Sequence, residues 1–229
     1  MNLLRTMLNC LRFLTLGLLL SLLSCTPSLS KKHLLVIGDS NGAGKGWVYA
    51  LQETRGGGPL VNTALGGNTV GFNWRNKLEY NSLENLTSYL RKGYAQMGKI
   101  DEVLISLGTN DCKVEFADRH PEIILNAATL VTRTRAFFTE RGQEVPRIVL
   151  ISPPPAGQNT AVSDEFQGVS ACVSQLTGQL RELATKEGLC FVDLQQNPGA
   201  KALAFSDDGI HFSSAGYELM AEAILKECY

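Results

Sequence analysis

The chain has 229 residues, of which 44% are hydrophobic and 19% are charged, as is typical of one globular domain with a sizeable core. Its formal net charge is −1, and removal of residues 1–24 takes away two arginines and no acidic residue, which leaves −3. A surface with this charge gives no electrostatic reason to expect nucleic acid as a partner, because nucleic-acid binding depends on a basic face.

The N-terminal stretch has the pattern of an export signal. Two arginines precede an apolar run over residues 13–23, which is too short to span a bilayer comfortably. The run ends in Leu22-Leu23-Ser24-Cys25, which resembles the lipobox of bacterial lipoproteins, where the cysteine is lipidated and becomes the new N-terminus. We therefore expect a lipoprotein signal peptide over residues 1–24 and a lipid on Cys25. The alternatives are a plain signal peptide and an N-terminal anchor helix.

The residues that follow are expected to link this anchor to the domain. Residues 25–32 are rich in serine, proline and lysine and are predicted to form a tether, so the domain is expected over residues 33–229. Thr26 stands where an aspartate retains enteric lipoproteins at the inner membrane, which favours the outer membrane over the inner. The expected location is the bacterial cell envelope, with the chain lipid-anchored to the membrane through Cys25 and facing the periplasm.

Export also guides the interpretation of the cysteines. Four of them remain beyond Cys25, and in an oxidising compartment they permit two disulfides in three connectivities. We expect Cys112 to pair with Cys172 and Cys190 with Cys228, because the second bond would join the C-terminal helix to the last strand. No CxxC pair or close His/Cys spacing occurs, so no metal site is expected.

Apolar periodicity beyond residue 33 predicts strands and helices in alternation. Short aliphatic runs predict five strands, and apolar residues spaced by three and four predict the helices. Because each strand is an almost unbroken aliphatic run, we expect an α/β fold with a parallel sheet covered on both faces. In chain order the predicted elements are strand 34–37, helix 45–54, strand 60–65, loop or broken helix 72–80, helix 82–97, strand 100–107, a helix from Pro121 ended by Gly142, strand 145–151, a helix ending at Gly188, strand 190–194, loop 195–212 and a helix capped by Ser213 or Ser214.

Polar or glycine-rich turns follow four of the five predicted strands. The carboxyl ends of parallel strands lie along one edge of a sheet, so residues far apart in sequence are expected to converge there on one shallow site. These turns are Gly38-Asp39-Ser40, Gly66-Gly67-Asn68, Gly108-Thr109-Asn110-Asp111, and Asp208-Gly209-Ile210-His211 in the loop after the last strand.

The residue types in these turns are those that acyl transfer needs. Ser40 is a candidate nucleophile and His211 the base that activates it near neutral pH. Asp208, three residues before His211, is expected to orient the imidazole and to stabilise its cation. The backbone N–H groups of Ser40 and Gly67 and the side-chain amide of Asn110 are candidate donors for an oxyanion hole.

Taken together, the four turns resemble the sequence blocks of the SGNH hydrolases, also called GDSL-type esterases. Gly38-Asp39-Ser40 is similar to the first block, residues 62–69 to the second with Gly67 at the oxyanion position, residues 108–111 to the third and residues 208–211 to the fifth. The turn at 41–44 is richer in glycine than in many members. The resemblance implies a flavodoxin-like, three-layer α/β/α sandwich around a five-stranded parallel sheet, and a Ser-His-Asp esterase with neither metal nor cofactor.

Two other motifs fit less well. Residues 38–42 match the G-x-S-x-G elbow of α/β-hydrolases, but those enzymes place the serine mid-chain and the acid well before the histidine. Gly44-Lys45 suggests a phosphate-binding loop, yet the pattern fails because residue 39 is Asp and residue 46 is Gly.

Several neighbouring residues have structural interpretations. Asp207 is the alternative to Asp208, with a different offset from His211. Asp39 and Asp111 are expected to accept hydrogen bonds from loop backbone. Trp74 is either a core or rim residue or a platform for a sugar ring. His33 and His120 are expected to be structural or solvated.

The expected function is that of a serine esterase that hydrolyses carboxylic esters. The polar loops at 153–163 and around Trp74 favour a carbohydrate or peptidoglycan O-acetylesterase, with a small ester or acylated glycan as substrate. The alternatives are a lysophospholipase or thioesterase that cleaves lipid acyl esters, and a non-hydrolytic acyltransferase or cell-wall binding module on the same fold.

Overall fold

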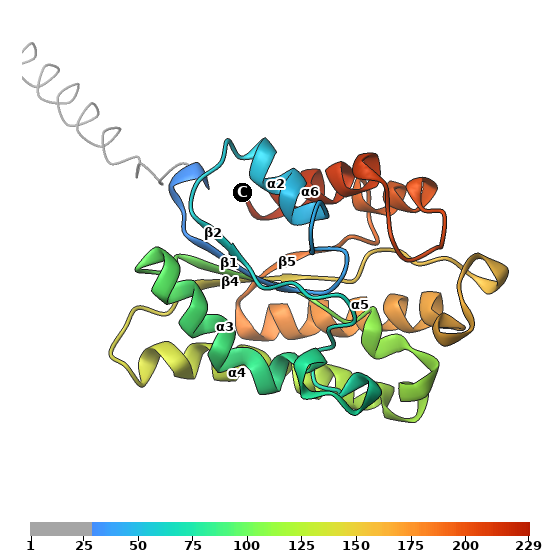
Figure 1. Cartoon of the computed structure of the whole chain (residues 1–229), viewed down its shortest axis with the longest axis horizontal. Coiled ribbons are helices and arrows are strands. Elements are labelled where there is room, and N and C mark those ends of the chain that lie inside the picture. Colours follow the sequence, from blue (N-terminus) through green and yellow to red (C-terminus); the bar gives the residue numbers. More distant parts are fainter. Residues whose placement is uncertain (1–28) are drawn as a thin grey trace, which may run out of the picture.

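The computed structural model describes residues 29–229, so the predicted signal peptide and the Cys25 lipidation site lie outside the described residues. Its centre is a five-stranded, wholly parallel sheet in the order β2-β1-β3-β4-β5. Helices α3, α4 and α5 cover one face and α2 and α6 the other (Figure 1), which confirms the predicted α/β/α sandwich. The strands are β1 Leu34–Gly38, β2 Leu60–Asn62, β3 Glu102–Ser106, β4 Arg147–Ile151 and β5 Cys190–Val192; the helices are α2 Trp47–Thr54, α3 Ser82–Met97, α4 His120–Thr139, α5 Val169–Glu187 and α6 Ser214–Cys228.

Strand β1 shows why the sheet is covered on both faces. Successive side chains of a strand point to opposite sides, so Leu35 and Ile37 enter the core under α3–α5. Leu34 and Val36 enter the core under α2 and α6. All four are fully buried, because neither face of this strand meets water.

Local capping signals set the ends of the best-predicted helix. The Asn81 side chain accepts the Leu83 and Glu84 N–H groups at the start of α3, and Gly98 ends the helix in the left-handed conformation. Helix α3 therefore has the predicted bounds. No helix among residues 29–229 combines the length and apolarity that a bilayer crossing requires.

Other elements differ from the predicted bounds. Strand β2 stops at Asn62 rather than at residue 65, because the Asn62 side chain accepts the Ala64 N–H and donates to the Gly42 carbonyl. Strand β5 stops at Val192, since Asp193 accepts the Gln195 N–H in a turn. The segment predicted as loop or broken helix at 72–80 contains two short 3₁₀ helices, Trp74–Asn76 and Leu78–Tyr80. The predicted loop 195–212 contains a 3₁₀ helix, Gly199–Phe205, and the strands predicted at 100–107 and 145–151 are shorter.

Both predicted disulfides are present. Cys112–Cys172 joins the loop after β3 to α5, and Cys190–Cys228 joins β5 to the last residue of α6. The first bond lies near the carboxyl edge of the sheet and holds the loop that carries Asn110 and Asp111. The second closes the chain's C-terminal end onto the edge strand.

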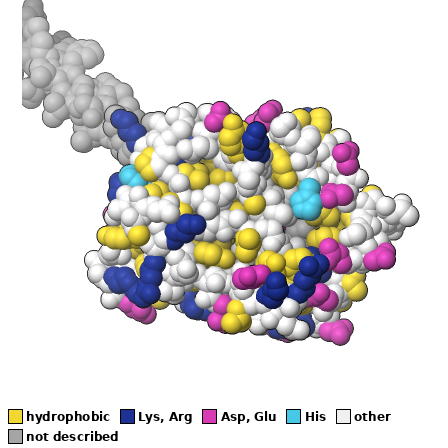
Figure 2. Space-filling model, viewed as in Figure 1, with side chains coloured by type: hydrophobic (Ala, Val, Ile, Leu, Met, Phe, Trp, Pro, Cys, Tyr) yellow, Lys and Arg dark blue, Asp and Glu magenta, His cyan; other side chains and the backbone are white. Residues whose placement is uncertain are grey.

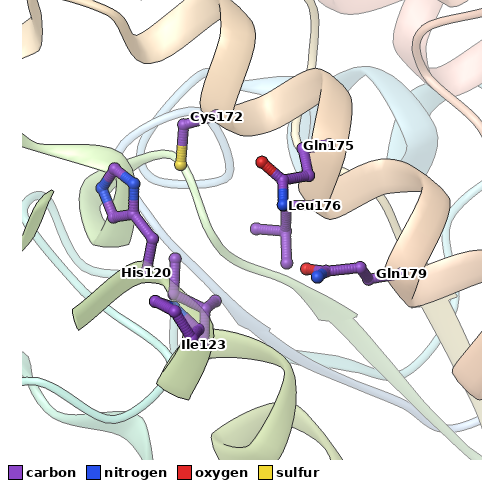
Figure 3. A pocket seen from close by; sticks show the side chains of 7 residues that line it. His120, Ile123, Cys172, Gln175, Leu176 and Gln179 are labelled. Carbon is purple, nitrogen blue, oxygen red and sulfur yellow. The ribbon is translucent and has the colours of Figure 1, made fainter. Parts of the chain in front are cut away.

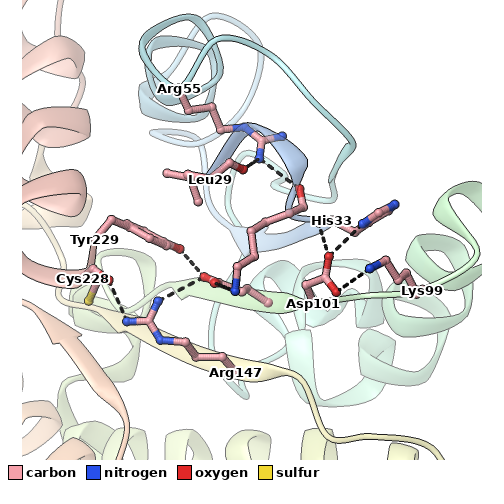
Figure 4. A network of polar contacts seen from close by, with 10 residues as sticks. Leu29, His33, Arg55, Lys99, Asp101, Arg147, Cys228 and Tyr229 are labelled. Atoms are coloured by element: carbon pink, nitrogen blue, oxygen red, sulfur yellow. Dashed lines mark hydrogen bonds and ion pairs between the residues drawn. The ribbon is translucent and has the colours of Figure 1, made fainter. Parts of the chain in front are cut away.

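A polar network closes the amino edge of the sheet (Figure 4). Buried Arg55 donates to the carbonyl oxygens of Leu29 and Lys32 and so fixes the first described residues onto the domain. Glu102, only 1% exposed, pairs with Lys32 Nζ at 3.1 Å and Arg147 Nη1 at 3.3 Å and accepts the Tyr229 hydroxyl. The last residues of the predicted tether are therefore packed against the amino edge.

Candidate active site

Ser40 lies in a tight turn that follows β1 at the carboxyl edge of the sheet. The Gly42 N–H donates to the Asp39 carbonyl at 3.1 Å, and the Asp39 carboxylate accepts the Asn41 N–H at 3.0 Å. Asp39 is buried, and burial raises its pKa to about 6, although the Asn41 hydrogen bond and the nearby His211 oppose the shift. Asp39 thus braces the serine turn, in the role expected from the sequence.

The turn over residues 208–211, which lies near the C-terminal end of the sequence, contacts Ser40. His211 Nε2 is 2.9 Å from Ser40 Oγ, and His211 Nδ1 is 2.7 Å from Asp208 Oδ2. Because the carboxylate can only accept there, the proton is on Nδ1 and Nε2 accepts the serine hydroxyl. His211 and Asp208 have side chains 48% and 55% exposed, so this chain of three groups lies in an open, shallow part of the surface.

The Asp208 carboxylate is organised by its own turn. Its Oδ1 atom accepts the N–H groups of Ile210 at 2.9 Å and His211 at 2.7 Å, which leaves Oδ2 for the imidazole. Burial raises the pKa of Asp208, but these hydrogen bonds and the imidazole outweigh it, and the net pKa is below the usual value. Asp208, rather than Asp207, makes the hydrogen bonds to His211.

Close backbone packing holds the turn in place. Gly209 has φ +72° and its carbonyl accepts the Gly157 N–H at 2.8 Å. A Cβ at Gly209 would lie 2.7 Å from the Ala161 carbonyl oxygen, so this position needs glycine. The loop after β4 therefore supports the histidine turn from behind.

Two asparagines connect the loops after β1, β2 and β3. Asn110 Nδ2 donates to the Asn68 carbonyl at 3.0 Å, and Asn68 Nδ2 donates to the Gly38 carbonyl at 3.0 Å. All three residues are buried. The predicted oxyanion residue Asn110 is thereby fixed beside the serine turn through Asn68, a connection that no sequence signal indicated.

Asp111 connects two of these loops, the one after β2 and the one after β3. Both of its carboxylate oxygens accept the Val70 N–H, at 2.9 and 3.0 Å, and the side chain is fully buried. Burial raises the pKa of Asp111 to about 7, with a further contribution from the nearby Asp39 carboxylate. Asp111 therefore supports the loop, as its predicted bracing role requires.

The Gly66-Gly67 segment lies next to the serine. A Cβ at Gly66 would be 3.9 Å from Ser40 Cβ, an ordinary van der Waals distance, so the two turns lie side by side. Within residues 29–229 the N–H groups of Ser40 and Gly67 donate no hydrogen bond, and Asn110 Nδ2 uses one of its two hydrogens. Three predicted oxyanion donors thus retain hydrogens for a ligand.

Trp74 covers Gly67. A Cβ at Gly67, which has φ +84°, would lie 2.3 Å from the indole Cζ3 atom, so the ring packs directly on the glycine. The Arg75 guanidinium carbon and Lys113 Nζ lie 4.2 and 3.3 Å from the ring centroid. Trp74 is a rim residue with two cations over its ring, which limits its use as a platform for a sugar.

The other histidines lie away from Ser40. His33 Nδ1 pairs with Asp101 at 2.8 Å in the amino-edge network. His120 lines a cavity of about 240 Å³ between α4 and α5, opposite Gln175, Leu176 and Gln179 (Figure 3). Within the described part of the chain, no group of three or more His, Cys, Asp or Glu side chains is arranged to hold a metal ion.

Comparison with known proteins identifies one matching family model. Residues 33–219 match the model of the GDSL-like Lipase/Acylhydrolase family. A search of curated protein sequences finds no match.

Solved structures share the fold. Est24, a carbohydrate acetylesterase from Sinorhizobium meliloti, is 23% identical, with a TM-score of 0.70 over 86% of this chain and 97% of that one. An inhibitor-bound aryl esterase from M. smegmatis is 24% identical, with a TM-score of 0.72 over 85% and 97%. A lipase/acylhydrolase from Enterococcus faecalis is 21% identical, with a TM-score of 0.58 over 86% and 94%.

Proposed function

We propose that this ester hydrolase, which belongs to the GDSL-like lipase/acylhydrolase family, cleaves its substrate with Ser40, His211 and Asp208. The observation that carries the proposal is the continuous hydrogen-bonded chain from Ser40 Oγ through the imidazole to Asp208. Its two distances, 2.9 and 2.7 Å, are within the range needed for proton transfer.

Hydrolysis proceeds through an acyl-enzyme. Ser40 Oγ attacks the ester carbonyl while His211 Nε2 takes the hydroxyl proton and then gives it to the leaving alcohol. Asp208, kept ionised by its lowered pKa, stabilises the imidazolium. A water molecule, deprotonated by His211, then attacks the acyl group and restores Ser40.

The oxyanion is held by the N–H groups of Ser40 and Gly67 and by Asn110 Nδ2. Within the described residues the Ser40 and Gly67 N–H groups have no acceptor, and Asn110 Nδ2 keeps a second hydrogen beyond the one it donates to the Asn68 carbonyl, which supports this assignment. Fixed donors of this kind stabilise the negative charge that develops in the transition state.

The substrate class we favour is an O-acetylated carbohydrate, from a polysaccharide or peptidoglycan. The reacting groups are exposed rather than placed at the end of a deep channel, which suits a polymer with a short acyl group. Beside the Asp208 turn, a hollow of about 430 Å³ is lined by uncharged residues that include Gln158, Asn159, Ser170 and Ser174. Acidic and basic side chains are interspersed over the face in Figure 2, which suits a neutral polymer. Similarity to a carbohydrate acetylesterase fold is consistent with this class.

An ester series tests the proposal. Wild type is expected to hydrolyse a chromogenic acetyl ester, and Ser40→Ala to lose turnover while keeping its melting temperature. Rates that fall from acetyl to palmitoyl esters support the carbohydrate substrate, as does acetate release from acetylated xylan or peptidoglycan. A preference for long chains would instead identify a lipid acyl hydrolase, and equal turnover by Ser40→Ala would refute the mechanism.

The place of action we propose is the bacterial envelope, with a lipid on Cys25. The lipobox-like sequence supports this, and so does the docking of Leu29 and Lys32 at the sheet edge opposite Ser40. Cells grown in labelled palmitate are expected to label wild type and not Cys25→Ala. Label that persists in Cys25→Ala would exclude this anchor.

A further inference from the structure

Lys113 is a buried cation next to the candidate site. Its side chain is 2% exposed, although it follows Cys112 in the loop that carries Asn110 and Asp111. A buried ammonium group is costly unless it has compensating partners. A surface lysine contributes to solubility, but a buried one does not, so the burial of Lys113 needs another explanation.

The partners of Lys113 are one carboxylate and two aromatic rings. Nζ lies 3.3 Å from Glu165 Oε2 and 3.3 Å from the centroid of the Trp74 ring, and 4.9 Å from that of Phe166. Burial lowers the pKa of Lys113, while Glu165 opposes the shift. A desolvated cation over an indole is attracted more strongly than an exposed one.

The indole in turn packs on the second predicted oxyanion residue. Trp74 lies so close to Gly67 that an added Cβ would meet Cζ3 at 2.3 Å and Cε3 at 2.4 Å. Trp74 thus connects the loop after β3, through Lys113, to the loop after β2, at Gly67. Asn110 and Gly67, which belong to these two loops, must keep a fixed separation to bind one oxygen atom.

We propose that Lys113 is a positioning residue, whose ammonium group holds the Trp74 indole against Gly67 and thereby fixes the Gly67 N–H for the oxyanion. This inference rests on the proposed function, because it assigns a task within the proposed oxyanion hole. Lys113 does not touch the reacting atoms, so its effect reaches the reaction only through Trp74 and Gly67.

Replacement of the charge by an apolar chain of similar length is the direct test. In Lys113→Met, kcat for the acetyl ester is expected to fall about 10-fold or more with KM changed less than about 3-fold, because oxyanion donors act mainly in the transition state. Lys77→Met is the matched control, since Lys77 is exposed and lies 5.8 Å from the Tyr80 ring in the neighbouring segment. Its kcat is expected to equal that of wild type.

A second variant separates the inference from a folding defect. Glu165→Gln removes the counterion of Lys113 at a half-exposed position, so folding is expected to be retained. Glu165→Gln is also expected to lower kcat, but by less than Lys113→Met does. A double-mutant cycle with Trp74→Leu is the decisive measurement. If Lys113 acts through Trp74, Lys113→Met has little further effect in the Trp74→Leu background.

Tryptophan fluorescence gives a readout that does not depend on catalysis. The chain has two tryptophans, so Trp47→Phe leaves Trp74 as the only emitter. In that background, Lys113→Met is expected to shift the emission and to increase quenching by acrylamide. Unchanged emission, unchanged kcat, or additive losses in the cycle would each overturn the positioning role. Retention of full turnover by Ser40→Ala would overturn the proposed function instead, so the two failures are distinguishable.

Discussion

The two edges of the sheet differ in how their buried carboxylates are compensated. At the amino edge, buried Glu102 is paired with Lys32 and Arg147 and accepts a hydroxyl from Tyr229. At the carboxyl edge, buried Asp39 and Asp111 accept backbone N–H groups, and among the described residues neither is within ion-pair distance of a Lys or Arg.

The amino edge therefore contributes to stability, and the carboxyl edge contributes to the candidate chemistry. Paired charges at the amino edge hold the first described residues and the C-terminal residues to the domain, where no candidate catalytic group lies. Unpaired carboxylates at the carboxyl edge keep three loops in register around Ser40, at a cost in desolvation that their raised pKa values report. Changes at the two edges are therefore expected to have separable effects.

The largest effect is expected from the base. His211→Ala removes the proton acceptor of Ser40, and kcat is expected to fall by roughly 10⁴-fold or more. Because His211 is half exposed, the melting temperature is expected to change little. Steady-state kinetics and thermal unfolding on the same preparation check both statements; substantial remaining activity would assign the base to another group.

Loss of an oxyanion donor is expected to be the next largest effect. Asn110→Ala removes one donor, which typically costs about 10²- to 10³-fold in kcat, or about 2.7–4 kcal/mol. The change also breaks the hydrogen bond to the Asn68 carbonyl. Asn68→Ala is the comparison. It keeps the backbone carbonyl that Asn110 Nδ2 binds, removes the hydrogen bond from Asn68 Nδ2 to the Gly38 carbonyl, and removes no proposed donor, so a smaller loss of kcat is expected. Equal losses would mean that Asn110 acts only as a brace.

The amino edge is expected to show the converse behaviour. Glu102→Ala leaves Lys32 and Arg147 without their carboxylate, and the free energy of unfolding is expected to fall by about 1–3 kcal/mol, since both cations are partly exposed and keep some hydration. The kcat of the acetyl ester reaction is expected to stay within about 2-fold of wild type, measured well below the melting temperature. A large loss of kcat would show that the edges are coupled.

The smallest effect is expected in the pH dependence of stability. Asp39 and Asp111, with folded pKa values of about 6 and 7, keep protons that the unfolded chain releases near pH 4. More protons are then bound in the folded state, so stability falls as pH rises from about 4 to about 7. Asp111→Asn is expected to flatten this slope by on the order of 1 kcal/mol per pH unit.

Asp101 is the matched control for this measurement. Although its burial acts to raise the pKa, hydrogen bonds from His33 and contacts with Lys99 lower it to about 2. Its contribution is present above about pH 4 and is lost as pH falls toward 2, so Asp101→Asn should leave the slope between pH 4 and 7 unchanged. Denaturant titrations at several pH values give both slopes.

Features set by neighbouring residues were predictable from the sequence. Helix α3 has the predicted bounds because the apolar residues that predicted it lie within one helix, and Asn81 and Gly98 cap it directly beyond them. The meeting of Ser40 with His211 was predictable because parallel topology places their turns at one edge. Predicting that Ser40 and His211 meet requires a parallel sheet, and it does not require the details of side-chain packing.

Features set by distant contacts were not predictable. Strand β2 ends early because Asn62 binds the Gly42 carbonyl across the sheet edge. The 3₁₀ helix Gly199–Phe205 has no clear apolar period, so the sequence predicts a loop there. Lys113 looks like any loop lysine in the sequence, since its burial depends on Trp74 and Glu165, which come from separate loops.

The hydrogen bonds from Arg55 to the Leu29 and Lys32 carbonyl oxygens limit how far the domain can lie from a membrane anchor. Only residues 26–28 separate Cys25 from the docked segment, so a lipid on Cys25 would stand at most about 14 Å of extended chain from it. The amino edge would then rest close to the bilayer, and Ser40, which follows the carboxyl end of β1, would lie at the opposite edge of the sheet. An enzyme anchored by so few residues would act on polymers on the side away from the membrane rather than on the lipids of the leaflet that anchors it.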